Sequence, residues 1–208
     1  MWLIPSRRRP HNLARLIRAC LASGMSTPAW IRLDQDDPML EGYKALARPG
    51  GWTFAVSSRK SLSGVYNEAF EISPNLDWYG FLADDVVPGT IEFDRLLIDA
   101  AGKDGLAFGD DGINGERHAT HFVLGGDLVR SVGFLALPGL ERIFIDTVWC
   151  DIARDRGVFR YLPNIKLTHV HFSNGLAPVD RTYRKSRKDE DKRRYESWRN
   201  SKNEEATP

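Results

Sequence analysis

One segment organises the predicted fold of this chain: Trp78-Tyr79-Gly80-Phe81-Leu82-Ala83-Asp84-Asp85-Val86-Val87-Pro88. It is an apolar run that ends at two adjacent acids and is closed by Pro88 and Gly89. A short aromatic and aliphatic run bounded by turn residues predicts a buried central strand, and ligands gather where such strands end in open α/β sheets. Two neighbouring carboxylates repel unless a cation or hydrogen-bond donors compensate, so the pair indicates a metal or substrate site. The alternative is that both acids are ordinary turn or cap residues.

The composition bounds the class of protein. A length of 208 residues with 42% hydrophobic content is enough for one domain with a sizeable core, and a net charge of +1 argues against the whole chain binding a polyanion. Cys20 and Cys150 each fall in a predicted helix, so we expect reduced core thiols and a reducing compartment. The apolar run before residues 7–9 is too short for a signal peptide, and no stretch approaches about 18 apolar residues. We therefore expect a cytoplasmic protein without a transmembrane segment.

Strands and helices alternate on both sides of the central segment. Strands are predicted at residues 2–4, 29–33, 52–56, 106–108, 121–124, 158–162 and 166–172, and helices at 13–21, 63–73, 90–101, 127–132 and from 146 to 157. This alternation predicts a single α/β domain over residues 1–176, with a Rossmann-like, mostly parallel sheet flanked by helices. Residues 109–117 form an exposed loop, which is either a lid or acceptor loop or an ordinary solvated loop.

Polar residues follow several of the predicted strands, where one ligand can collect them. They are Pro5, Ser6 and Arg8 after the first strand, Asp34 after the second, Arg59 after the third, Asn67 in the next helix, and Asp84 with Asp85. A nucleotide diphosphate requires such a set, because an acid can accept a hydrogen bond from the base while basic side chains meet the phosphates. A divalent cation between carboxylate and diphosphate would assist the leaving group. Mg²⁺ or Mn²⁺ suits oxygen ligands, and Mn²⁺ tolerates a histidine better.

In these features the chain resembles the GT-A glycosyltransferases, particularly those of the family 2 type, over residues 2–172. The matching motifs are Ile4-Pro5-Ser6-Arg7-Arg8-Arg9-Pro10, Leu33-Asp34-Gln35-Asp36-Asp37, Gly64-Val65-Tyr66-Asn67-Glu68-Ala69 and Phe81-Leu82-Ala83-Asp84-Asp85. The last one stands at the position of the family's Asp-x-Asp motif, although Ala83 replaces its first acid. The resemblance implies that Asp85 binds the metal and that Asp84 contacts the ribose or the sugar.

Two later segments extend the resemblance. Residues 122–130 are similar to the acceptor-side segment, and Ile145-Asp146-Thr147-Val148-Trp149 resembles an acidic motif that supplies the general base in inverting members. His169-Val170-His171-Phe172 resembles the C-terminal strands, where a histidine completes the metal shell, and we favour His169 over His171. The alternatives are that Asp146 is a helix N-cap and that the histidines have hydrogen-bonded core or surface roles.

The resemblance implies a glycosyltransferase that moves a sugar from a nucleotide-sugar donor, UDP-linked, with Mn²⁺ or Mg²⁺. It leaves the acceptor open among glycan, protein, lipid and nucleic acid. One rival is a nucleotidyltransferase or pyrophosphorylase on a related sheet, which normally has a Gly-rich phosphate turn where this chain has Ser6 and three arginines. Another is a binding module that has lost catalysis and uses the basic tail.

The tail, residues 177–208, differs from the rest of the chain in charge. Residues 179–202 carry ten basic and five acidic side chains, with Tyr183, Tyr195 and Trp198 among them. This pattern indicates a helix followed by disorder, and it permits contact with nucleic acid or an acidic membrane. The alternative, which we favour, is a solvated helix that packs its aromatic residues on the domain. Because the whole candidate site precedes it, we expect the tail to serve acceptor recruitment or solubility and its deletion to spare donor hydrolysis.

Overall fold

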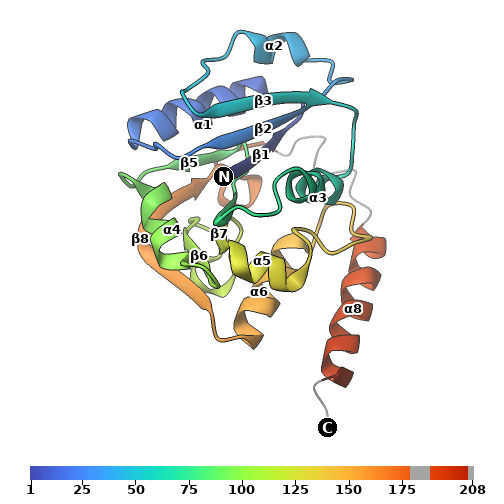
Figure 1. Cartoon of the computed structure of the whole chain (residues 1–208). Helices are drawn as coiled ribbons and strands as arrows, with labels where there is room; N and C mark the ends of the chain where they lie inside the picture. The colour runs from blue at the N-terminus through green and yellow to red at the C-terminus, as the bar shows by residue number, and fades with distance from the viewer. Residues whose placement is uncertain (179–187, 206–208) are drawn as a thin grey trace.

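A computed structural model describes residues 1–178 and 188–205, and in this part of the chain one eight-stranded sheet has helices on both faces (Figure 1). The strands are β1 (Trp2–Ser6), β2 (Ala29–Asp34), β3 (Trp52–Ser57), β4 (Trp78–Phe81), β5 (Val86–Pro88), β6 (Leu106–Asp110), β7 (Phe122–Gly125) and β8 (Phe159–His169). The helices are α1 (Pro10–Ala22), α2 (Leu40–Lys44), α3 (Leu62–Ile72), α4 (Phe93–Ala101), α5 (Gly126–Val132), α6 (Ile145–Asp155) and α8 (Lys188–Glu205), with 3₁₀ turns η1 (Gly115–Arg117) and η2 (Phe172–Asn174).

The strand order is β3-β2-β1-β4-β7-β6-β8-β5. Strand β1 pairs in parallel with β2 and β4, and β2 pairs in parallel with β3, so the carboxyl ends of these four strands lie at one edge of the sheet. Strand β7 runs antiparallel to β4 and β6, and β6 is parallel to β8. The predicted α/β class with a mostly parallel sheet is confirmed.

Two hydrophobic clusters pack on opposite faces of the sheet. Leu3 of β1 belongs to a cluster with residues of α3, α5 and α6, whereas Trp2 and Ile4 belong to one with residues of α1 and α4. This split follows from the alternation of side chains along a strand. Gly80 is required within β4, because a Cβ there would lie 2.4 Å from the Trp2 ring. The close contact between β1 and β4 therefore depends on the absence of a side chain at Gly80, and this contact sets where the acid pair after β4 lies.

Several local predictions were wrong. Residues 158–162 and 166–172 were predicted as two strands, but β8 is one strand through Pro163, with a bulge where its register to β6 shifts at Gly109 and Asp110. The central segment contains two strands, because the chain turns at the acid pair and continues as β5, antiparallel to β8. Helix α2 was not predicted. Both cysteines are buried free thiols in helices, as predicted, and the described residues contain no helix that could span a membrane.

The C-terminal helix α8 packs on the domain, as the favoured alternative for the tail predicted. Tyr195 and Trp198 lie against the cluster that contains α6, and Figure 1 shows α8 (red) as the outermost helix on that side. The Tyr195 hydroxyl donates to Asp151 of α6 at 2.6 Å. Tyr183 and residues 206–208 of the predicted tail lie outside the described residues.

Candidate functional site

The turn between β1 and α1 is held in an unusual backbone conformation. Arg8 has φ 61°, a left-handed value that is uncommon for a residue other than glycine. Its backbone N–H donates to Asp37 Oδ2 at 2.7 Å, and the N–H of Arg9 donates to the Tyr43 hydroxyl at 2.9 Å. These bonds from the segment after β2 fix the direction in which the three arginines leave the turn.

Arg9, rather than Arg8, meets the acid pair after β4. Its guanidinium lies 3.1 Å from Asp84 Oδ1 and 2.9 Å from Asp85 Oδ2. Asp84 is 1% exposed, and its other oxygen accepts a 2.6 Å hydrogen bond from Ser6. Because Asp84 is enclosed by Ser6 and Arg9, it holds the turn in place, and these contacts give no support to the predicted direct contact with a ribose or sugar.

Asp85 and His169, the two predicted metal ligands, lie together. His169 Nε2 is 3.4 Å from Asp85 Oδ1, and both side chains are largely buried. Burial acts to raise the pKa of Asp85, but the hydrogen bond with His169 and the charge of Arg9 outweigh it and hold that pKa below its usual range. Asp85 therefore stays a carboxylate throughout the neutral range.

A third histidine, His121, completes this cluster. Its ring contacts that of His169 edge to face, with centroids 4.8 Å apart. Burial, followed by the nearby His169, lowers the pKa of His121 to about 3, so the ring is neutral. Within the described residues, Nε2 of His121 and Nδ1 of His169 are buried ring nitrogens without a hydrogen-bond partner. Buried polar atoms of this kind are uncommon away from functional sites.

A cavity of about 640 Å³ opens beside this cluster. It is lined by Ile113, Asn114, Arg117, His118, Thr120, Asp146, His169, His171 and Ser173. One wall is the loop predicted as a lid or acceptor loop, and Asp111 organises it by accepting hydrogen bonds from Ile113 N–H at 2.8 Å, Asn114 N–H at 2.7 Å and the Thr120 hydroxyl at 3.0 Å. The loop is therefore held in one conformation by these bonds and forms one wall of the cavity.

Asp146 enters the cavity from the first turn of α6. The N-cap of that helix is Phe144, with φ 68°, so Asp146 is not the N-cap that the alternative proposed. Its Oδ1 accepts from the Thr147 N–H at 2.9 Å, and its Oδ2 lies 3.0 Å from His118 Nε2. The other ring nitrogen of His118 is 3.7 Å from the Cys150 sulfur, one helical turn after Asp146.

His118 and Asp146 form an ion pair at neutral pH. The hydrogen bond to Asp146, followed by the contact with Cys150, raises the pKa of His118 to about 10. Burial acts to raise the pKa of Asp146, but the hydrogen bond and charge of His118 outweigh it and lower that pKa. The arrangement supplies an ionised carboxylate, 36% exposed, in a fixed orientation at the cavity.

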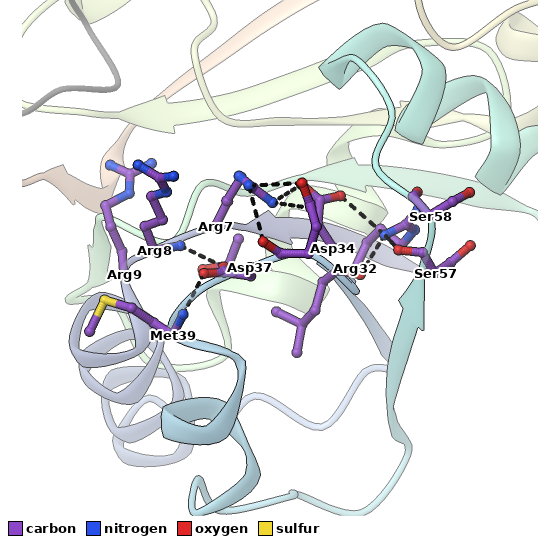
Figure 2. A network of polar contacts seen from close by, with 12 residues as sticks. Arg7, Arg8, Arg9, Arg32, Asp34, Asp37, Met39, Ser57 and Ser58 are labelled. Carbon is purple, nitrogen blue, oxygen red and sulfur yellow. Dashed lines mark hydrogen bonds and ion pairs between the residues drawn. The ribbon is translucent and has the colours of Figure 1, made fainter.

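The ends of β1 and β2 hold a second polar network, which Figure 2 shows from close by. Arg7 Nη1 lies 2.9 Å from Asp34 Oδ2, and Arg32 Nη1 lies 3.4 Å from Asp34 Oδ1. Arg32 also donates to the Ser58 carbonyl at 2.6 Å, which ties the end of β2 to the end of β3. Pro5, which was predicted to bind the nucleotide-sugar donor, pairs with Arg32 in the register between β1 and β2. It therefore belongs to the same corner of the sheet.

The other predicted donor-binding residues differ in their placement. Arg8 and Arg59 are exposed. The hydrogen bond from Arg7, with the charge of Arg59, lowers the pKa of Asp36, so Arg59 lies near this corner. Asn67 accepts from the N–H groups of Leu135 at 3.0 Å and Ala136 at 2.8 Å, and it donates to the Ala136 carbonyl at 2.9 Å. Asn67 thus fixes the chain after α5, and its contacts give no support to the predicted donor contact.

The sequence analysis missed three residues of the site: Arg9, His118 and His121. Arg9 is one of three consecutive arginines, and only the left-handed turn at Arg8 determines which of them faces the acids. His118 lies 28 positions before Asp146, so no local spacing relates the two. The one available signal was the number of histidines, because four of the five in the chain lie around the cavity: His118, His121, His169 and His171.

This topology, with ligand-type side chains at the carboxyl ends of β1, β2 and β4, is the GT-A fold. The chain is similar over 81% of its length to a mannosyltransferase from Pyrobaculum calidifontis, solved with GDP-mannose and Mn²⁺, with 9% identity and a TM-score of 0.59. That match covers 55% of the mannosyltransferase chain, so this chain spans about half of its length. No family model and no curated protein matches the sequence.

Two further solved structures share the fold. A putative nucleotide-diphospho-sugar transferase from Desulfovibrio desulfuricans is similar over 89% of this chain and 90% of its own, with 14% identity and a TM-score of 0.56. A nucleotidyl transferase from Methanothermobacter thermautotrophicus is similar over 81% of this chain and 85% of its own, with 12% identity and a TM-score of 0.51. At these identities the likeness establishes the fold, and activity has to be argued from the site.

Proposed function

We propose that this chain is a glycosyltransferase that moves a sugar from a UDP-linked donor to an acceptor, with a divalent metal ion. The observation that carries the proposal is that three candidate residues far apart in sequence, Asp85, His169 and Asp146, are linked through His169. His169 contacts Asp85 and also lines the cavity that Asp146 enters. Metal-ligand and base-type residues beside a cavity at the carboxyl ends of parallel strands are what sugar transfer from a nucleotide requires.

The donor side is proposed to lie over the corner formed by β1, β2 and β3. Asp34 has carboxylate lone pairs beyond those used by Arg7 and Arg32, so it can accept a base N–H. Arg8 and Arg59 are exposed cations at this corner and are suited to the phosphates. Ser6 and Asp84 act through Arg9, whose position they fix.

Asp85 and His169 suit an Mn²⁺ or Mg²⁺ ion whose remaining coordination positions are filled by the substrate and water. No group of three or more His, Cys, Asp and Glu side chains within residues 1–178 and 188–205 is arranged to hold a metal alone. Such ions commonly take one or two protein ligands and fill the remaining positions with phosphate oxygens and water. The carboxylate of Asp85 and the Nε2 atom of His169 that faces it, 3.4 Å apart, suit this pattern, and a histidine ligand favours Mn²⁺. When bound, the ion would neutralise charge that develops on the departing nucleoside diphosphate.

Asp146 is proposed as the general base. Its lowered pKa keeps it ionised, and its exposed part faces the cavity where an acceptor hydroxyl has to lie. His118 keeps the carboxylate in one orientation by bonding Oδ2, while the Thr147 N–H bonds Oδ1. The remaining lone pairs can take the hydroxyl proton as the acceptor oxygen attacks the sugar.

A thermal-shift screen of nucleotides and nucleotide sugars, with and without Mn²⁺, tests the proposal. A donor at a hundredfold excess over its dissociation constant stabilises the folded state by about 2.7 kcal/mol, which for a chain of this size raises Tm by about 5–10 °C. We expect UDP and a UDP-sugar to give this shift only with Mn²⁺, and the UDP-sugar to release UDP on incubation. If no nucleotide shifts Tm under any metal condition, the proposal is wrong.

The likeness to a nucleotidyl transferase supports one second candidate, transfer of a nucleotidyl group to a sugar phosphate. The turn after β1 counts against it, because its three arginines and Ser6 stand where that chemistry normally uses a Gly-rich phosphate loop. Pyrophosphate release from a nucleoside triphosphate and a sugar 1-phosphate would favour the second candidate, whereas UDP release from a UDP-sugar favours the first.

Arg9 is expected to compete with the metal for Asp85, since its guanidinium lies 2.9 Å from that carboxylate. In Arg9→Gln, the nucleotide-free protein should bind Mn²⁺ more tightly, by at least about tenfold or 1.4 kcal/mol, because a positive charge is removed from the site. The loss of the free Mn²⁺ signal in electron paramagnetic resonance measures this binding. Arg18→Gln is the matched control, because Arg18 lies exposed on α1. Equal or weaker Mn²⁺ binding in Arg9→Gln would show that Arg9 does not screen Asp85.

A further inference from the structure

The C-terminal helix α8 holds the segment that leads to Asp146. Its residue Asp191 is only 1% exposed, although it lies in a run of charged residues. The Asp191 carboxylate accepts hydrogen bonds from three consecutive backbone N–H groups: Glu141 at 2.7 Å, Arg142 at 2.9 Å and Ile143 at 2.9 Å. Bonds from several N–H groups to one carboxylate are charge-assisted and among the stronger hydrogen bonds in proteins.

Other contacts of α8 reach the same part of the chain. The Tyr195 ring stacks on Phe144, with centroids 5.0 Å apart and planes at 10°. Arg194 Nε donates to the Pro138 carbonyl at 2.8 Å. Arg199 pairs with Asp155 near the end of α6, so α8 is fixed to both ends of that helix. We call residues 138–144 the base-leading segment.

The base-leading segment needs such external bonds. Phe144 has a left-handed backbone, which costs of the order of 1–3 kcal/mol outside glycine and persists only where the surroundings enforce it. The three N–H groups bound by Asp191 precede α6, and Asp146 follows Phe144 by two residues. A change in this segment therefore moves the start of α6 and with it the Asp146 carboxylate.

We propose that Asp191 is a positioning residue for Asp146, acting through the base-leading segment, so that the C-terminal helix is part of the active-site structure. The expected effect of Asp191 on turnover rests on the proposed function. Its expected effect on the position of Asp146 does not. This role of Asp191 differs from the expectation that the tail serves acceptor recruitment or solubility and that its deletion spares donor hydrolysis. Removal of residues 179–208 would also remove Asp191 and is expected to disturb the site.

The test compares full-length Asp191→Asn with full-length Asp189→Asn. Both changes remove one negative charge from the first turn of α8, but Asp189 is exposed. In Asp191→Asn one carboxylate oxygen becomes an amide donor that opposes a backbone N–H, so the base-leading segment loses at least one of its bonds.

The first measurement is an NMR titration of the His118 ring. Asp146 and Cys150 are the titratable groups that face this ring, so its pKa reports how closely Asp146 is held. We expect the pKa to be near 10 in the wild type and in Asp189→Asn, and to fall by about one unit or more in Asp191→Asn. A role of Asp191 in stability alone would not shift this pKa in a folded variant.

The second measurement is turnover of the donor identified by the screen. Misplacement of a catalytic group by about 1 Å can cost of the order of 10²-fold, so we expect kcat to fall roughly 10- to 100-fold in Asp191→Asn with the donor KM unchanged. If the chain has no transferase activity, the titration alone decides. If Asp191→Asn does not fold, Asp191→Glu is measured in its place by the same two criteria. A folded variant with the His118 titration and kcat of Asp189→Asn would overturn the inference.

Discussion

We expect Asp146→Asn to lower turnover by about 10²- to 10⁴-fold, which is the usual contribution of a positioned general base. Asparagine keeps the carbonyl oxygen that accepts from the Thr147 N–H, but it cannot take a proton from an acceptor hydroxyl. Because the pair with His118 is partly exposed, its loss should lower Tm by only a few degrees. Donor binding should be unchanged, since none of the contacts proposed for the donor involves Asp146.

Turnover is measured as UDP release, donor affinity by calorimetry and Tm by circular dichroism. Asp99→Asn, an exposed Asp-to-Asn change on α4, controls for loss of charge. The His118 titration is an internal check, because removal of Asp146 as an anion should bring the pKa of His118 down from about 10. Near-normal turnover in a folded Asp146→Asn would assign Asp146 a structural function, and a product with retained anomeric configuration would exclude the single-displacement base mechanism.

Asp85→Asn should abolish the dependence of nucleotide binding on Mn²⁺. The wild type is expected to bind UDP at least tenfold more tightly with Mn²⁺ than with a chelator, a difference of about 1.4 kcal/mol. In Asp85→Asn the two affinities should become similar, because an amide is a much poorer ligand for a divalent ion than a carboxylate. Calorimetric titrations of UDP in both conditions measure the ratio.

Asp84→Asn is the matched comparison for this prediction. Both acids contact Arg9, but Asp84 also contacts Ser6, whereas Asp85 contacts His169. Asp84→Asn should therefore keep the Mn²⁺ dependence even if its absolute affinity falls. Both variants remove one member of a buried ion pair and lose stability, so circular dichroism has to show that they are folded at the temperature of measurement. An undiminished Mn²⁺ effect in Asp85→Asn would remove Asp85 from the metal site.

The sequence predicted the parts of the site that depend on strand order. An apolar run that ends in acids indicates a strand end, and parallel strands bring their carboxyl ends to one edge, so the meeting of Asp84 with Ser6 followed from pattern alone. The placement of His169 beside Asp85 came from the resemblance, and the structure confirms that the two lie together. The roles of these residues in binding and catalysis stay predictions.

The sequence could not predict contacts that depend on short elements or on turn geometry. Strand β5 has three residues, too few for a periodic pattern, so no strand was predicted after the acid pair. Two strands were predicted on either side of residues 163–165, but β8 continues through them with a register shift against β6. Asp191 appeared to be one of many solvated charges, and only the three amides almost 50 residues earlier explain its burial.

The placement of α8 also affects the order in which the protein becomes functional during synthesis. The bonds between Asp191 and the segment before Asp146 join positions 48 to 50 residues apart. At roughly 5–20 residues per second, the ribosome adds that length in a time of the order of seconds. Strand β8 ends at His169, 22 residues before Asp191, so in the last part of this interval the sheet can already be folded while the base-leading segment lacks its bonds to Asp191. A nascent chain that has completed β8 should therefore bind a nucleotide before it can turn one over.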